Sequence, residues 1–160
     1  MPIRLPIAWI ILLNVMGWPV IHLAVAKLFL RLPGSCFGGN GWLFRSRTWE
    51  RAGHTYERFT GVRLWKQMLP DGAAFFRGFA KKKLQSTARS YFAIFIRETC
   101  RGELAHWVMM SAAPVFFLWN PPWADGVMCL YAIAANLPCI ITQRYNRIRL
   151  RRVGRARWNG

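Results

Sequence analysis

The polar residues that could do chemistry in this sequence lie close together in an otherwise apolar stretch. Glu103 and His106 are three residues apart, so on a helix their side chains share a face. Glu98 precedes Glu103 by about a turn and a half of helix. A carboxylate beside an imidazole can orient the ring, and the ring can then act as a general base. The alternative is that the two carboxylates only form ion pairs with the neighbouring Arg97 and Arg101.

Three apolar runs must position these side chains. Residues 5–30 form the first run, which exceeds the length of about 20 residues that a helix needs to cross a bilayer. Residues 104–119 and 124–142 form two more runs, separated only by a short turn that contains two prolines. Such a turn predicts that the last two runs form an antiparallel hairpin. The sequence therefore predicts an all-α integral membrane protein with about three transmembrane helices, in a single domain of residues 1–160.

Counting from the turn places polar residues of the two hairpin arms at the same depth. His106 lies about fifteen residues before Pro121 and Asn136 about fifteen after it, which is some 22 Å along each helix. The polar residues that the same count places opposite residues 98–101 are Gln143, Arg144, Asn146 and Arg147. Polar side chains at membrane depth are costly unless they have a role. We therefore interpret this end of the hairpin as a candidate site.

Basic residues lie almost entirely on one side of the expected spans. Lys and Arg outnumber Asp and Glu by 23 to 6, for a formal net charge of +17. Residues 31–103 and the tail 144–160 hold nearly all of these cations. The positive-inside rule then places both segments in the cytoplasm and the N-terminus outside, in a multi-pass protein of the bacterial inner membrane. Membrane topology and anionic lipid explain such a charge better than a nucleic acid does, so no nucleic-acid partner is expected.

The long segment between the first two runs has the composition of a membrane interface. Aromatic and basic residues alternate through residues 41–79, and such mixtures favour the boundary between lipid and water. We expect short amphipathic helices on the cytoplasmic leaflet, broken at Gly61 and at Pro70-Asp71-Gly72. The run Lys81-Lys82-Lys83 indicates a solvated face that anionic lipid attracts.

Other candidate groups support weaker hypotheses. Cys100 lies one turn before Glu103 and could be a nucleophile, but a buried, inert thiol is the simpler interpretation. Asn14 and His22 suit helix packing within the first span. The carboxylate–imidazole pair supplies two ligands, fewer than a metal site requires, so no metal is expected. The sequence contains no nucleophile elbow, P-loop or dinucleotide fingerprint.

Three blocks of residues carry a family resemblance. The first contains Trp65-Lys66 and Pro70-Asp71-Gly72, the second runs from Glu98 to Trp107, and the third ends in Gln143-Arg144-Tyr145-Asn146-Arg147. In order and spacing they resemble the glycosyl-4,4'-diaponeurosporenoate acyltransferases, small bacterial membrane enzymes that attach a fatty acyl chain to the sugar of a carotenoid glycoside. The resemblance extends from about residue 49 to 150. Ile148 departs from it, because the family usually has a proline there.

The resemblance implies O-acyl transfer from a thioester donor to a sugar hydroxyl of a glycosylated carotenoid or a similar isoprenoid glycoside. The donor would be acyl-CoA or an acyl carrier protein, used as a co-substrate with no bound cofactor. An acidic carrier protein would be attracted by the basic surface. His106 would act as the base, with Glu103 and Glu98 as its carboxylates. The residues expected to bind substrate are Arg144, Asn146, Arg147, Gln143, Asn136, Asp71, Lys66, Trp65, Arg101 and Trp107.

Two other classes of function stay open. One is a different membrane enzyme acting on a polyprenyl or lipid substrate, of the methyltransferase or reductase type, which would carry a bound nucleotide cofactor. The other is a non-enzymatic membrane scaffold. A scaffold would keep its product profile when His106 and Glu103 are replaced by alanine.

Overall fold

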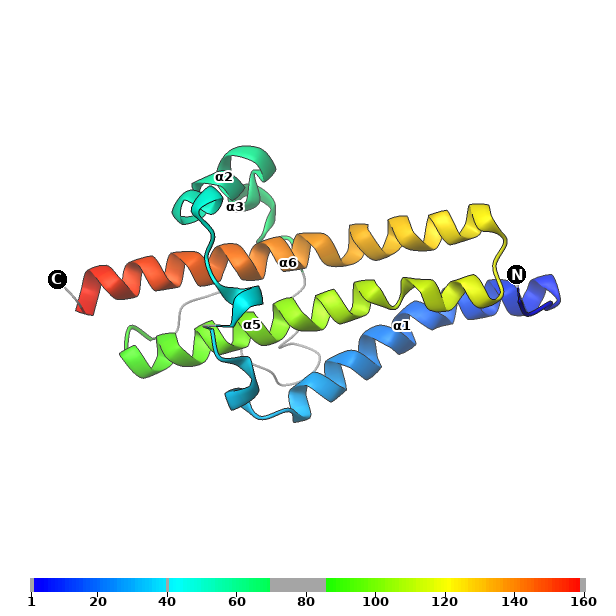
Figure 1. Cartoon of the computed structure of the whole chain (residues 1–160), viewed down its shortest axis with the longest axis horizontal. Helices are drawn as coiled ribbons and strands as arrows, with labels where there is room; N and C mark the ends of the chain where they lie inside the picture. The colour runs from blue at the N-terminus through cyan, green and yellow to red at the C-terminus, as the bar shows by residue number, and fades with distance from the viewer. Residues whose placement is uncertain (1, 40, 70–85, 159–160) are drawn as a thin grey trace.

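The computed structural model describes residues 2–39, 41–69 and 86–158, and within these ranges all regular structure is helical. The long helices are α1 (Ile7–Arg31), α5 (Arg89–Ser111) and α6 (Pro122–Trp158). The shorter ones are the 3₁₀ helices η1 (Gly34–Phe37), η2 (Trp42–Phe44), η3 (Thr48–Gly53) and η4 (Ala113–Leu118), and the α-helices α2 (His54–Thr60) and α3 (Val62–Trp65). The long helices form an elongated bundle, and α2 and α3 stand beside α6 (Figure 1).

Two helices, α1 and α6, are long and apolar enough to cross a membrane. Along α1, large apolar side chains such as Ile7, Val20 and Leu23 are more than half exposed. A helix of a water-soluble protein turns its apolar stripe toward the core, and apolar surface of this extent marks contact with a partner or a membrane. The two helices therefore suggest membrane association.

The first expected span agrees with α1, but the second differs from the structure. α1 begins directly after Pro6, a residue that suits a helix start. Residues 104–119 do not form one helix, because α5 ends at Ser111 and the chain continues as the 3₁₀ helix η4. Pro114 lies at the start of η4; it has no backbone N–H, and its ring opposes continuation of an α-helix. α5 instead extends back to Arg89, so its polar residues lie in its middle.

The third expected span, residues 124–142, is only the first part of α6. This helix continues without a break through Pro138 to Trp158, over 37 residues, which is about 55 Å. Arginine and leucine are good helix formers, so the basic tail extends the helix rather than ending it. Gly61, with φ of 59°, separates α2 from α3 as expected, whereas residues 70–72 and 81–83 lie outside the described residues.

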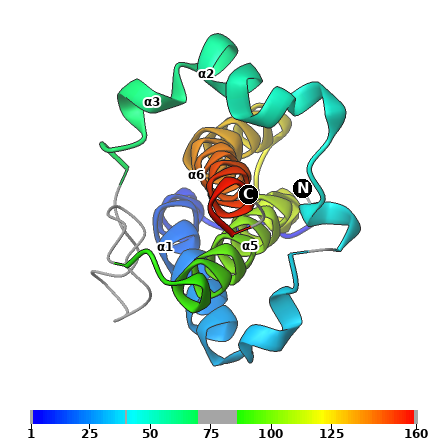
Figure 2. The same ribbon diagram turned by 90° about the vertical axis from the view of Figure 1, so that its left-hand side faces the viewer.

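α5 and α6 lie side by side and run in opposite directions (Figures 1 and 2). α1 lies along α5, and the segment from η1 to α3 arches around the bundle (Figure 2).

At one end of the bundle, Asn14 of α1 and the fully buried Asn120 exchange hydrogen bonds of 2.8 and 3.1 Å, and Trp119 Nε1 donates to Asn14 at 2.9 Å. Asn14 thus has the helix-packing role expected of it.

Candidate functional site

Four charged side chains form a buried ion cluster between α5, α6 and η3: Glu50, Glu103, Arg144 and Arg147. Glu103 is fully buried, with Arg144 Nη1 at 3.0 Å from its Oε1 and Arg147 Nη1 at 2.5 Å from its Oε2. Arg144 Nε lies 2.5 Å from Oε1 of Glu50, which is also fully buried. Two carboxylates thus balance two guanidinium groups. Such balance is needed because an unpaired buried charge destabilises a protein by several kcal/mol.

Both terminal nitrogens of Arg144 also bind the backbone of the segment before η3. Its Nη1 donates to the carbonyl of Leu43 at 2.8 Å, and its Nη2 donates to the carbonyl of Arg45 at 3.1 Å. Arg147, only 1% exposed, places its guanidinium 5.4 Å from the centroid of the Phe44 ring. Arg144 and Arg147, which belong to the third sequence block, therefore tie residues 43–45 to α6. Every nitrogen of Arg144 is engaged within the protein, which makes it a cross-link.

Glu50 was missed by the sequence reasoning. Tyr56 donates to its Oε1 at 2.7 Å, and the backbone N–H of Arg47 donates to its other oxygen. Between Glu50 and Tyr56 the chain turns sharply, with left-handed φ of 45° at Arg51 and 58° at Ala52, a conformation that costs about 1–2 kcal/mol per residue. The sequence did hold one indication of its role. The chain has only six acidic residues, so each of them is a candidate partner for a buried arginine.

The pKa of Glu50 is set by two opposing effects. Burial raises it, but the hydrogen bonds from Arg144, the Arg47 backbone and Tyr56 outweigh burial and hold the pKa below its usual range. In turn, burial and the hydrogen bond to Glu50 raise the pKa of Tyr56. Near neutral pH, Tyr56 is therefore a neutral donor to a charged carboxylate.

We expect this carboxylate to make the protein acid-sensitive. A depressed folded-state pKa contributes stability that is present above the ordinary carboxyl pKa and is lost as pH falls through the folded value. The melting temperature of the wild type should therefore fall as the pH is lowered below 4.5, the ordinary glutamate value. Glu50→Gln should melt lower than the wild type at pH 7 and lose less on acidification. Thermal unfolding of both proteins in nanodiscs from pH 7 to 3 measures this, and parallel curves would remove Glu50 from the acid response.

His106 forms a polar contact between the two long helices. Its Nδ1 lies 3.0 Å from Oδ1 of Asn136, which is fully buried and donates through its Nδ2 to the carbonyl of Ala132 at 2.9 Å. Because Oδ1 can only accept, Nδ1 carries the proton of the neutral ring. The lone pair of the neutral imidazole is then on Nε2. Counting residues from the turn predicted that His106 and Asn136 lie at the same depth, and in the structure they are in contact.

Glu98 forms an ion pair with Arg101 rather than a contact with His106. Its Oε1 lies 2.8 Å from Arg101 Nη1, while Arg101 Nη2 donates to the carbonyl of Leu32 at 3.1 Å and its guanidinium lies 4.9 Å from the Phe37 ring centroid. This is the ion pair that the sequence left open as the alternative for Glu98. The pair fastens the segment after α1 to α5.

Of the other residues expected to bind substrate, some have hydrogen-bond partners within the protein, some are buried without one, and one lies outside the described residues. Lys66 Nζ donates to Asn146 Oδ1 at 3.3 Å, which joins the first and third sequence blocks, and Trp65 donates to the carbonyl of Thr60 at 2.6 Å. Gln143 Oε1 and Trp107 Nε1 are buried without a hydrogen-bond partner among the described residues. Asp71 lies outside the described residues.

The weaker candidates have structural positions. Cys100 is fully buried, as expected of an inert thiol. The ring of His22 packs 5.9 Å from that of Trp18. In the part of the chain that the structure describes, no three side chains of the metal-binding types gather.

Comparisons with known proteins agree on one family. The sequence model of glycosyl-4,4'-diaponeurosporenoate acyltransferase matches residues 40–156. The chain is 35% identical over 134 residues to the protein of that name from Staphylococcus haemolyticus (strain JCSC1435), covering 83% of this chain and 78% of the relative. It is 34% identical over 137 residues to the one from Staphylococcus aureus (strain bovine RF122 / ET3-1), covering 84% and 82%. No solved structure matches significantly.

Proposed function

The chain belongs to the glycosyl-4,4'-diaponeurosporenoate acyltransferase family, and from this premise we propose that it transfers a fatty acyl group from a thioester donor to a sugar hydroxyl. The acceptor is a glycosylated carotenoid or a similar isoprenoid glycoside held in the membrane. The observation that carries the proposal is the hydrogen bond of 3.0 Å between His106 and Asn136. It presents an imidazole with its basic nitrogen defined, beside a long apolar surface that suits lipid substrates.

In the proposed reaction, Nε2 of His106 takes the proton from the sugar hydroxyl as the hydroxyl oxygen attacks the thioester carbonyl. The carbon–sulfur bond then breaks, and the leaving thiolate takes the proton back from the imidazolium. Asn136 holds the ring in the tautomer that can accept a proton. Trp107 Nε1 and Gln143 Oε1, buried without partners among the described residues, offer a donor and an acceptor for the reacting groups.

Glu103 has a different role in this proposal from the one expected from its spacing to His106. Both of its oxygens lie against arginines of α6, so it supports the site through the buried ion cluster. The cluster fixes α6 against α5 at the level just beyond Asn136. The depth of Asn136 relative to His106 depends on that register, because one turn of slip would move the amide by about 5 Å.

We propose that the chain crosses the membrane three times, with the last part of α5 and η4 together forming the second crossing. A reporter fused after Gly160 and one inserted near Lys82 should then both be cytoplasmic, because the basic segments stay inside. A reporter inserted between Pro121 and Pro122 should be external. Paired phosphatase and fluorescent-protein fusions measure this. A cytoplasmic signal at the proline turn would leave two crossings at most.

The test of the function is product analysis with and without the protein. A strain that makes the glycosylated carotenoid should accumulate its acyl ester only when this chain is expressed. Purified protein in nanodiscs that contain the glycoside should form the same ester from a long-chain acyl-CoA or an acylated carrier protein. If neither the strain nor the purified protein forms an ester, the acyl-transfer proposal is wrong for this chain.

A further inference from the structure

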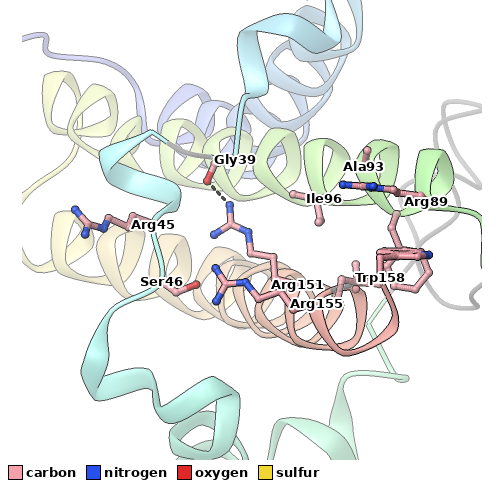
Figure 3. Close-up of a pocket in the computed structure, with 12 residues that line it drawn as sticks. Gly39, Arg45, Ser46, Arg89, Ala93, Ile96, Arg151, Arg155 and Trp158 are labelled. Carbon is pink, nitrogen blue, oxygen red and sulfur yellow. Dashed lines mark hydrogen bonds between the residues drawn. The ribbon is translucent and has the colours of Figure 1, made fainter. Parts of the chain in front are cut away.

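A basic cavity lies beyond the buried ion cluster, between the start of α5 and the end of α6. Its volume is about 740 Å³, within the range of sites for small molecules and cofactors. Arg89 contributes from α5, and Arg151 and Arg155 contribute from α6. In Figure 3 the last two point from α6 into the space that faces α5, whereas Arg45 at the rim points away. No residue that lines the cavity is acidic.

These arginines are poorly neutralised within the protein. Among the described residues, no carboxylate forms an ion pair with Arg89, Arg151 or Arg155. Three guanidinium groups around one cavity repel one another unless an anion joins them. Guanidinium groups bind phosphate through paired hydrogen bonds. The cavity therefore has the chemistry of a site for more than one phosphate.

One end of the cavity is aromatic. Trp158 meets Phe92 edge-on, with ring centroids 5.0 Å apart, and both line the cavity. Gly154 permits this arrangement, since a Cβ there would come within 2.8 Å of the Trp158 ring. An aromatic side chain among arginines suits a base stacked beside phosphates, because every nucleobase has a π face. A phospholipid headgroup has no such group.

Contacts of Arg151 and Phe44 link the cavity to the buried ion cluster. Arg151 donates to the carbonyls of Gly39 and Phe44, and the Phe44 ring lies against Arg147 of the buried ion cluster. Arg151 is fifteen residues beyond Asn136, or about 22 Å, and its longer side chain spans part of that distance because helical side chains point toward the N-terminus. The pantetheine arm of coenzyme A has thirteen bonds between sulfur and phosphorus, about 15 Å when extended. An arm of this length covers most of that separation.

We propose that this cavity binds the phosphorylated nucleotide end of a coenzyme A thioester. The phosphates lie among Arg89, Arg151 and Arg155, the adenine lies against Trp158, and the pantetheine arm runs past Phe44 toward His106. This assignment rests on the proposed acyl transfer and names its donor. It makes coenzyme A, rather than a carrier protein, the group that the chain recognises.

The test compares two double variants that remove equal charge from the same two helices. All four arginines are exposed, but Arg89 and Arg155 line the cavity and Arg97 and Arg157 do not. Arg89→Gln with Arg155→Gln therefore removes two cations from the cavity, and Arg97→Gln with Arg157→Gln removes two from elsewhere on the same helices. Binding of free coenzyme A is measured by calorimetry on the whole chain in phosphatidylcholine nanodiscs. The cavity variant should bind about tenfold more weakly or worse, as expected for lost charge-assisted hydrogen bonds. The control variant should bind as the wild type does.

Three ligands that differ in their phosphate groups test which parts of coenzyme A the cavity binds. Affinity should fall from coenzyme A to dephospho-coenzyme A, which lacks the 3′-phosphate, and fall again to pantetheine, which has no phosphate. Equal weakening in both double variants would reduce the effect to net charge and overturn the proposal. The same variants are also compared in nanodiscs that contain phosphatidylglycerol, to measure binding of an anionic lipid. If anionic lipid binding depends on the cavity arginines and coenzyme A binding does not, the cavity is a lipid site and the proposal is wrong.

The binding test is independent of catalysis. If coenzyme A does not bind but ester forms from an acylated carrier protein, the cavity assignment fails and the acyl-transfer proposal stands. If coenzyme A binds in the cavity but no ester forms from any donor, the cavity assignment stands and the acyl-transfer proposal fails.

Discussion

His106→Ala is expected to lower the rate of acyl transfer by about 100-fold or more, the range usual for a lost general base. The variant keeps the neighbouring helices but removes the only group in the proposed mechanism that takes the hydroxyl proton. Wild-type activity should fall as pH drops through the imidazole range, because the imidazolium has no lone pair to accept a proton. Initial rates in glycoside-containing nanodiscs, measured between pH 5 and 9, provide both results.

His22→Ala is the matched control for this prediction. His22 is also a half-buried histidine of a long helix, and its ring packs near Trp18 on α1 rather than against Asn136. Its loss should leave the rate near that of the wild type. Asn136→Leu should lower kcat more than it raises KM, because it leaves the ring in place without its orienting partner. Full activity in His106→Ala would refute the base assignment.

Glu103→Gln is expected to destabilise the protein by about 3–5 kcal/mol, the range for breaking a buried ion pair by removing one partner. Arg147 is 1% exposed, and its ion-pair partner among the described residues is Glu103. The substitution therefore leaves a guanidinium charge buried beside an uncharged amide. Equilibrium unfolding in mixed micelles measures the change in the free energy of unfolding.

The double variant Glu103→Gln with Arg147→Met tests whether charge is the cause. Methionine is long, apolar and flexible, so it can fill the space beside Phe44 without leaving a buried cation. The double variant should be more stable than Glu103→Gln alone, because both members of the pair are then gone. If the two substitutions simply add, the stability of this region comes from packing rather than from the buried ion cluster.

Long apolar runs made the outer helices predictable from sequence, and a proline made the middle one hard to predict. Residues 5–30 and 124–142 have the length and composition of α1 and the first part of α6. Hydropathy marked residues 104–119 as one span, but Pro114 ends α-helical geometry there. The basic tail gave no apolar periodicity, so its helix was not expected, although arginine favours helix formation.

The site also has a part that the sequence predicts and a part that it does not. The contact between His106 and Asn136 could be predicted by counting residues from the turn, because the rise of an α-helix is fixed. Glu50 could not be found in this way. It lies in an irregular segment whose direction is set by left-handed residues at Arg51 and Ala52, and no periodicity of the sequence specifies such a turn. Its contact with Arg144 spans 94 positions of the chain.

The length of α6 has a kinetic consequence. In the proposed topology, the helix of about 55 Å is longer than the hydrocarbon core of about 30 Å, so its basic C-terminal end extends into water. In the proposed reaction, the glycoside in the lipid and the donor in the water would both bind along this one helix. The rate should follow the mole fraction of glycoside in the bilayer and not its amount per volume of solution. Diluting the bilayer with inert phospholipid should slow the enzyme, whereas adding buffer at a constant donor concentration should not.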